Sequence, residues 1–269
     1  MAHAVVLGSA AGGGFPQWNS NAPACRRARR GDAAARARSQ ASLAVSANDR
    51  DWVVLNASPD LRSQIEATSW LQPREGLRSS PIAGVVLTGG DVDAIAGLLH
   101  LRERIELAGA SGACGLAVVA FAVPGKVPLY LETTGQDPGL SEEGDAVGLE
   151  IIETTTGKSL FFIPGCAAMT DELRRRLASS ALVFFDGTLW RDDEMIRLGV
   201  GSKTGRRMGH MSMSGEDGTI AAFRNLGVGR RIFIHINNSN PALLDDSPER
   251  RIANAAGWEI AYDGMEVTL

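Results

Sequence analysis

The sequence has few of the residues that form disulfides and bind metal ions. Its 269 residues include three cysteines, Cys25, Cys114 and Cys166, and four histidines. Cysteines that are odd in number and far apart in the chain do not suggest a disulfide framework. This usage is typical of proteins kept in a reducing compartment, so we expect a cytoplasmic protein.

Long apolar runs and an excess of positive charge are also missing. No stretch approaches the roughly 18 apolar residues of a membrane-spanning helix, and Met1–His3 leads into an apolar run without the pattern of a secretory signal. The formal net charge of −4 argues against a general nucleic-acid binder. The arginines between positions 26 and 38 lie among alanines, which is typical of a solvated loop or helix. We expect neither nucleic acid nor a membrane span.

The apolar content of 44% is sufficient for one large α/β domain or two small ones. We find no repeat of fixed period and no linker, so we treat residues 1–269 as a single domain. Short apolar runs predict strands at 4–7, 40–46, 52–55, 82–87, 116–123, 147–153, 159–163, 182–185, 231–234, 258–261 and 265–268. Helices are expected at 94–106, 170–177, 218–223 and 248–256, and a further helix is expected to begin with Ser58 as its cap and Pro59 at its first position.

Mixed strands and helices, arranged twice in succession, suggest two sheets that face each other with helices outside. This architecture is an α/β/β/α sandwich. Periodicity alone also permits a doubly wound parallel sheet.

A glycine-rich loop follows the first expected strand. Gly12–Gly14 precede the segment Phe15–Asn19, and three glycines in a row permit positive φ and a close approach to another group. We expect this loop to line a site, and a tight structural turn is the alternative. Neither the dinucleotide-binding spacing nor the phosphate-binding Gly-Lys-Ser/Thr pattern is present, so the loop does not predict phosphate binding.

Carboxylates and histidines stand where expected strands end. Asp91 and Asp93 follow one apolar run, Asp186 ends another, and His235 directly follows a third, while His210 lies in a glycine-rich segment. Clustered carboxylates raise one another's pKa unless a cation neutralises them, and a metal ion is the simpler solution. Histidines at such positions bind metals or transfer protons.

Cationic and amide residues accompany these histidines. The expected substrate-binding residues are Trp18, Lys203, Arg206, Arg207, Asn237 and Asn238, with Tyr130 as a second aromatic ring for stacking. Arginine pairs with carboxylates in a bidentate manner, so this set suits a substrate with several carboxylates. A solvated turn is the alternative for each residue taken alone.

Motifs along the chain resemble those of the coenzyme PQQ synthesis protein B family, which belongs to the metallo-β-lactamase-like superfamily. They read GSAAGGGFPQWN at 8–19, NASPDLRSQI at 56–65, VFFDGTLWRDDEM at 183–195, KTGRRMGHMSMSG at 203–215 and FIHINNSNP at 233–241, with shorter matches at 246–250 and 261–267. The resemblance spans nearly the whole chain in order. It implies the α/β/β/α sandwich and work in the biosynthesis of pyrroloquinoline quinone (PQQ).

The resemblance also implies a modified metal site. The superfamily motif H-x-H-x-D-H reads Gly-Gly-Asp-Val-Asp-Ala at 89–94, so only Asp93 matches, and Asp91 replaces one histidine by an oxygen ligand. Asp186 resembles the metal-bridging aspartate, and His235 resembles the last histidine. An oxygen-rich set with imidazoles suits a single iron better than a zinc pair. We expect Asp91, Asp93 and His235 to bind Fe2+.

Two functions are compatible with this resemblance. One is an iron- and oxygen-dependent hydroxylase that oxidises the tyrosine ring of the Glu-Tyr precursor of PQQ, with His210 and Asp186 as catalytic residues. The other is a binding protein that carries PQQ or its precursor toward the periplasm. Zinc-dependent hydrolysis is weakened by Gly89 and Ala94, which cannot ligate. The expected partners are the precursor and other proteins of the pathway, and homodimer formation is left open.

Two departures from the family pattern concern other segments. Relatives carry a C-x-C-x-x-C cluster where this chain has Ser20, Ala22 and Cys25, and one thiolate cannot hold a structural zinc, which takes four ligands. The chain is also expected to be shorter than its relatives near 104–116.

Overall fold

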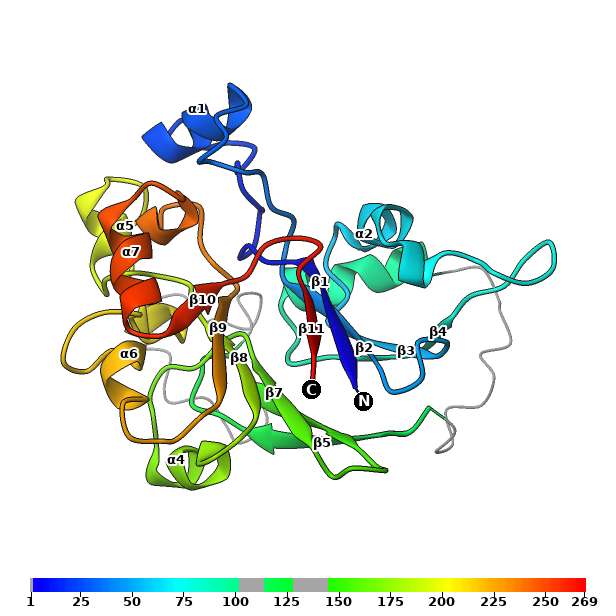
Figure 1. Cartoon of the computed structure of the whole chain (residues 1–269). Coiled ribbons are helices and arrows are strands. Elements are labelled where there is room, and N and C mark those ends of the chain that lie inside the picture. The colour runs from blue at the N-terminus through cyan, green and yellow to red at the C-terminus, as the bar shows by residue number, and fades with distance from the viewer. Residues whose placement is uncertain (1, 102–113, 128–144) are drawn as a thin grey trace.

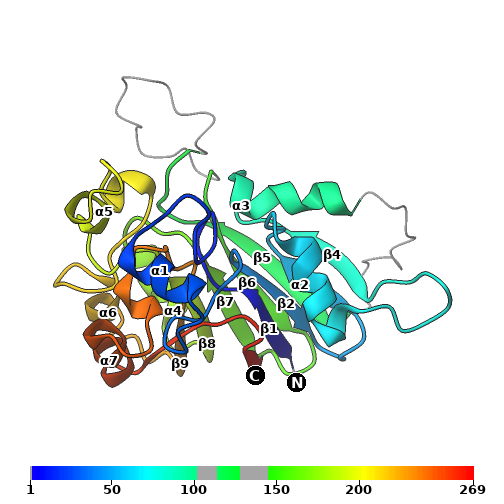
Figure 2. The same ribbon diagram turned by 90° about the horizontal axis from the view of Figure 1, so that it is seen from above.

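The computed structural model describes residues 2–101, 114–127 and 145–269. Within these residues, two β-sheets face each other, and helices lie along their outer sides (Figures 1 and 2). The α/β/β/α sandwich is therefore confirmed, and the single doubly wound sheet is excluded. The two ends of the chain lie side by side, because the last strand pairs with the first. None of the described helices is both long and apolar enough to cross a membrane.

The first sheet contains, in spatial order, β11 (Glu266–Thr268), β1 (His3–Gly8), β2 (Ser42–Ser46), β3 (Trp52–Leu55) and β4 (Ile82–Val86). Its neighbouring strands are antiparallel except β3 and β4, which run parallel. The strand at 52–55 has the predicted bounds, and the others begin or end within two residues of them.

The second sheet has six strands, in the order β10 (Trp258–Ile260), β9 (Arg230–Ile234), β8 (Leu182–Asp186), β7 (Ser159–Ile163), β6 (Val147–Glu153) and β5 (Leu116–Ala122). From β7 to β10 the strands are parallel, and β5 and β6 are antiparallel to their neighbours. Because parallel strands end at the same edge of a sheet, the segments after β7, β8 and β9 lie together.

The helices are short and flank the two sheets. They are α1 (Pro23–Arg29), α2 (Leu61–Ala67), α3 (Val92–Ile95), α4 (Asp171–Leu177), α5 (Glu194–Arg197), α6 (Thr219–Ala222) and α7 (Pro248–Ala255). Helices α2 and α3 lie beside the first sheet, and α4, α6 and α7 lie beside the second (Figures 1 and 2). Helix α1 contains Arg26, Arg27 and Arg29 of the arginine-rich segment, and Arg27 forms ion pairs with Asp32 and Asp246.

The core forms three layers because successive side chains of a strand point to opposite faces. Between the sheets, Val6, Phe162 and Phe184 belong to one buried cluster. Their chain neighbours point outward: Val5 packs under α2 in a second cluster, and Phe185 packs under the other helices in a third. Residues of β8 are therefore buried on both faces, as expected for a strand inside a parallel sheet.

Two helix predictions are corrected by the structure. Ser58 does not cap α2, because its hydroxyl accepts a hydrogen bond from Asp60 N at 3.2 Å, one turn before the helix begins at Leu61. The helix expected at 94–106 begins earlier, as α3, and continues as a 3-10 turn over Ala96–His100; positions 102–106 lie outside the described residues. The helix expected at 170–177, in contrast, forms as α4, and Thr170 caps it by accepting from Leu173 N at 3.1 Å.

Candidate functional site

A cavity of about 600 Å³ opens where the strands of both sheets end. Its walls come from the glycine loop (Gly12 and Gly13), the segment after β4, the turn after β7 (Pro164 and Gly165) and residues after β8 and β9. The glycine loop approaches the opposite wall closely, since a Cβ on Gly12 would lie 3.3 Å from Asp93 Oδ2. This agrees with the prediction that the loop lines a site.

Asp186 ends β8 and is fully buried behind the cavity. Its Oδ1 accepts hydrogen bonds from the backbone N of Thr188 at 3.0 Å and from the Thr188 hydroxyl at 2.7 Å. Its Oδ2 accepts from Cys166 N at 2.9 Å and lies 2.8 Å from His210 Nδ1. A buried carboxylate held by several donors is fixed in position, so Asp186 orients the His210 ring.

Thr188 connects this carboxylate to the second histidine. Its hydroxyl lies 3.1 Å from His210 Nδ1 and 2.9 Å from His235 Nδ1. A hydroxyl donates one hydrogen and can accept two, so with its hydrogen on Asp186 it can accept from a ring N–H. Thr188 was not predicted from the sequence, although it stands in the segment Asp186-Gly187-Thr188 at the end of a strand.

His235 adopts a backbone conformation that side chains rarely take, with φ at 59°. Its neighbour Ile236 holds this turn, because Ile236 N donates to Ser9 O at 3.0 Å and Ile236 O accepts from Ala11 N at 2.9 Å. The ring Nε2 lies 2.9 Å from Asp93 Oδ2. Strain that the surrounding structure maintains is common at functional sites, and here it turns the imidazole toward Asp93.

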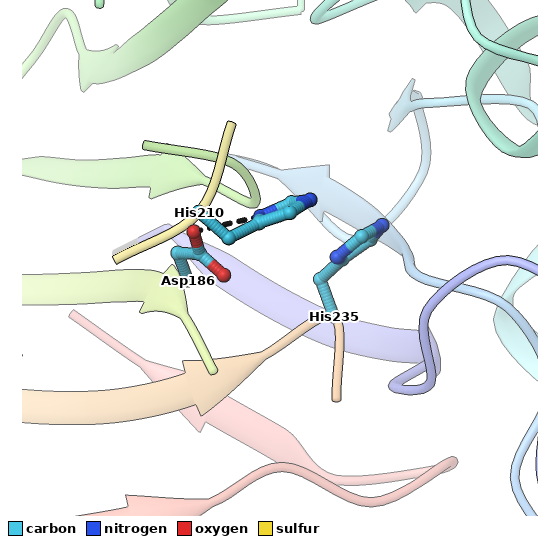
Figure 3. A group of neighbouring side chains, drawn as sticks. All are labelled: Asp186, His210 and His235. Atoms are coloured by element: carbon cyan, nitrogen blue, oxygen red, sulfur yellow. Dashed lines mark hydrogen bonds and ion pairs between the residues drawn. The ribbon is translucent and has the colours of Figure 1, made fainter. Parts of the chain in front are cut away.

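Asp186, His210 and His235 form a candidate metal group (Figure 3). Each offers a ligand atom, and these atoms all lie within 4.8 Å of one another. The two imidazole rings stack, with centroids 5.2 Å apart and planes inclined by 22°. Two imidazoles and one carboxylate fit a divalent transition metal such as Fe2+ or Zn2+.

Charge within the site is balanced by the Asp93–His235 pair. Burial opposes ionisation of Asp93, but the hydrogen bond and positive charge of His235 outweigh it and hold the pKa of this carboxyl below its usual value. Burial likewise opposes protonation of His235, yet Asp93 raises the pKa of the imidazole. The buried thiol of Cys166 is different: burial and the nearby Asp186 raise its pKa to about 12, so it stays protonated and is not a nucleophile.

The structure brings together part of the predicted site. Asp91, Asp93, His235, Lys203 and Asn237 line the cavity, as does His210. Asp186 lies behind it and reaches it through His210.

Other predicted substrate-binding residues lie outside the cavity lining. Trp18 is 83% exposed, and Asn238 is buried. Arg206 begins a short turn, and its guanidinium pairs with the Asp217 carboxylate at 3.5 Å. Arg207, the next residue, is exposed. Tyr130 lies outside the described residues, as does most of the segment 104–116.

The lining also includes residues that the sequence analysis did not identify. Lys126 stands after β5, and Asn56 and Thr88 stand just after the ends of β3 and β4. Asn56 Nδ2 donates to Thr88 Oγ1 at 2.9 Å, and Thr88 N donates to Asn56 Oδ1 at 2.8 Å. The positive φ of Asn56, 63°, is a backbone feature that no motif search reveals.

The position of the family's cysteine cluster is occupied by the start of α1. Cys25 is fully buried, with its Sγ 3.6 Å from Asn238 Oδ1. Ser20 Oγ accepts from Ala22 N at 3.3 Å. The prediction that no structural zinc binds here remains a prediction.

Comparisons with known proteins agree with the architecture. A family model described as a β-lactamase superfamily domain matches residues 51–112 and 104–236. A crystal structure described as Zn2+-bound PqqB from Methylobacterium extorquens is 46% identical, with a TM-score of 0.93 over 99% of this chain and 100% of that one.

Two curated relatives carry the same protein name. Coenzyme PQQ synthesis protein B of Gluconacetobacter diazotrophicus is 54% identical, and the match covers 100% of both chains. Its counterpart from Rhodopseudomonas palustris is 48% identical, again over 100% of both chains.

Proposed function

The chain belongs to the coenzyme PQQ synthesis protein B family, and we propose that it acts in the biosynthesis of PQQ. Within that pathway we propose an iron- and oxygen-dependent hydroxylation of the tyrosine ring of the Glu-Tyr precursor. The observation that carries this proposal is the group Asp186, His210 and His235 beside a cavity of about 600 Å³. Two histidines and one carboxylate are the ligand set of many non-haem iron oxygenases.

In this proposal Asp186, His210 and His235 hold the iron, which replaces the set of Asp91, Asp93 and His235 expected from the sequence. Asp91 and Asp93 lie on the adjoining wall. Bound Fe2+ would supply the one-electron chemistry that allows O2 to react with an aromatic ring. Asp93 keeps His235 in place and, being ionised, can accept the proton that the ring carbon loses. Thr188 fixes both imidazoles against Asp186.

We propose that polar residues of the cavity wall bind the substrate. Lys203 and Asn237 reach the cavity, and Lys126 joins them as a second lysine. Lysine ammonium groups suit the carboxylates of the precursor. We propose that these residues orient the precursor with its ring toward the histidines, while the methionines Met195 and Met208 contribute apolar surface to the same cavity.

The overall reaction replaces one aryl C–H bond by C–OH. One atom of O2 enters the ring, the other leaves as water, and an external reductant supplies two electrons with two protons. An assay with Fe2+-loaded protein, 18O2, ascorbate and a Glu-Tyr substrate should give a product that is heavier by one 18O atom. Unchanged substrate, with tight binding of the precursor, would favour the carrier function instead.

The carrier function is kept as a second candidate because two superfamily ligand positions are Gly89 and Ala94, and both line the cavity. A carrier needs the cavity but no metal chemistry. It predicts equal affinity for PQQ with and without Fe2+. The cytoplasmic location, contacts with other pathway proteins and homodimer formation also remain proposals, which cell fractionation and light scattering can test.

A further inference from the structure

Glu194 is a buried carboxylate that the proposed reaction does not use. It begins α5, is 7% exposed, and lies next in sequence to Met195 of the cavity wall. Its Oε2 accepts from Trp190 N at 2.7 Å, and its Oε1 accepts from the Ser239 hydroxyl at 2.6 Å. Above pH 7, where this carboxyl is ionised, it only accepts hydrogen bonds, so the hydrogen of Ser239 points toward Glu194.

The direction of this first bond determines the next ones. With its hydrogen committed to Glu194, Ser239 Oγ can only accept, and Asn237 Nδ2 donates to it at 2.6 Å. The amide oxygen of Asn237 therefore points away from Ser239, and it accepts from Asn238 Nδ2 at 3.2 Å. Asn238 Nδ2 also donates to Gln17 Oε1. From Asn238 to Glu194 every bond donates toward the carboxylate, and the same Asn238 amide group donates to Gln17 on its other side.

This chain of hydrogen bonds begins outside the cavity and ends at its wall. Glu194, Ser239 and Asn238 are buried, whereas Asn237 and Gln17 line the cavity. Amide side chains can present either oxygen or nitrogen with almost the same shape, so their orientation is decided by the hydrogen-bond network around them. A carboxylate at one end of the network decides that orientation for every member.

We propose that Glu194 is a positioning residue that sets which atom of Asn237 and of Gln17 faces the bound ligand, acting through Ser239. The cavity then presents a fixed pattern of donors and acceptors to the polar groups of its ligand. This proposal rests on the proposed function only in taking a PQQ-like molecule as that ligand. The network itself is a property of the unliganded chain.

The proposal can be tested by reversing the donor and acceptor roles in the hydrogen bonds that link Glu194, Ser239 and Asn237. In Glu194→Gln, the amide oxygen must meet Trp190 N, so the amide nitrogen faces Ser239 and donates to it. Ser239 then donates onward and requires an acceptor at position 237. Asn237→Asp supplies such an acceptor, so it suits the Glu194→Gln background. In the wild-type background, the same substitution places two carboxylates on one hydroxyl hydrogen.

The first measurement is thermal unfolding at pH 8 for wild type, both single variants and the double variant. We expect the loss in Tm caused by Asn237→Asp to be at least ~3 °C smaller in the Glu194→Gln background than in wild type. The same cycle in a Ser239→Ala background should show no such coupling. Equal losses in the two backgrounds would overturn the proposal, since a merely structural Glu194 gives additive effects.

The second measurement is PQQ affinity by isothermal titration. Glu194→Gln should bind PQQ ~10-fold more weakly, because donors and acceptors in the cavity exchange places. Glu216→Gln, an exposed carboxylate outside this network, is the matched control and should bind as wild type does. Wild-type affinity in Glu194→Gln would contradict the proposal. If wild type itself fails to bind PQQ, the carrier function fails, while the unfolding cycle still decides the role of Glu194.

Discussion

Asp93 Oδ2 and His235 Nε2 lie 2.9 Å apart, although 142 residues separate them in the chain. Asp93 follows β4 of the first sheet, and His235 follows β9 of the second, so this contact joins the two sheets at the cavity. The positive φ of His235 and the absence of a side chain on Gly12 both permit it. The candidate site is thus built at the point where the two halves of the sandwich meet.

Thr188→Val should loosen the metal group without emptying the space that the side chain fills. The variant leaves Asp186 and both imidazoles without the shared hydroxyl, which costs about 1–3 kcal/mol of unfolding free energy. Loss of such an outer partner lowers metal affinity by roughly 10–100-fold. Chemical denaturation and Fe2+ titration check the two effects. Thr188→Ser keeps the hydroxyl and serves as the control, and equal losses in both variants would contradict this role.

Gly97→Ala should disrupt the support of the Asp93 segment. Gly97 N donates to Ala57 O at 2.8 Å, and a Cβ there would lie 2.0 Å from Ser58 O. Such overlap forces the backbone apart, with a cost of about 1–3 kcal/mol or more. Gly84→Ala is the matched control, because nothing lies within 4 Å of its added Cβ. Denaturation midpoints that fall equally in both variants would show that backbone approach at Gly97 is unimportant.

Glu194 should make stability depend on pH. Burial, aided by Glu249, raises the pKa of this carboxyl from 4.5 to about 7, although its bonds to Ser239 and to backbone N–H groups oppose the rise. The folded chain then holds a proton that the unfolded chain releases, so stability is greater near pH 5 and falls as the pH rises through 7.

The size of this effect can be isolated with Glu194→Gln, which does not titrate. The wild-type unfolding free energy minus that of the variant should fall by roughly 2.5 kcal/mol between pH 5 and pH 8. Urea denaturation at several pH values measures the difference, in which the other titrating groups cancel. A constant difference would mean that Glu194 has an ordinary carboxyl pKa in the folded protein.

Lys203→Ala and Trp18→Ala should differ in PQQ affinity. Lys203 lines the cavity, and loss of its charge should weaken binding by ~10-fold or more. Trp18 is 83% exposed and does not line the cavity, so its truncation should leave affinity unchanged. Isothermal titration of both variants provides the check. Weak binding by Trp18→Ala alone would restore the stacking role that the sequence suggested.

The sequence predicted the strands well, because buried strands such as β8 read as continuous apolar runs bounded by a polar residue. It also identified His235 from its position directly after a strand and His210 from the glycine-rich segment around it. It could not predict that Asp186 meets His210, since that contact depends on how the glycine-rich segment before Met211 folds back. The backbone bond from Met211 N to Cys166 O, 2.7 Å long, makes that fold.

Trp18 illustrates why the remaining site residues were harder to predict. The motif places it beside the glycine loop, but Arg29 of α1 donates to the backbone oxygens of Gln17 and Ser20 and turns the intervening residues outward. Conversely, Thr188 contributes through one hydroxyl that joins Asp186 to His210 and His235, which lie 22 and 47 positions further along the chain. Hydrogen-bond networks of this kind are set by tertiary contacts, which periodicity and motifs do not record.

We propose that Asp186, His210 and His235 together hold one iron. Elemental analysis of protein reconstituted anaerobically with Fe2+ and then desalted tests it most directly. We expect about one iron per chain in wild type and in His100→Ala, an exposed histidine outside the group, and little in His210→Ala or His235→Ala. Iron retained equally by all four proteins, or by none of them, would contradict the account.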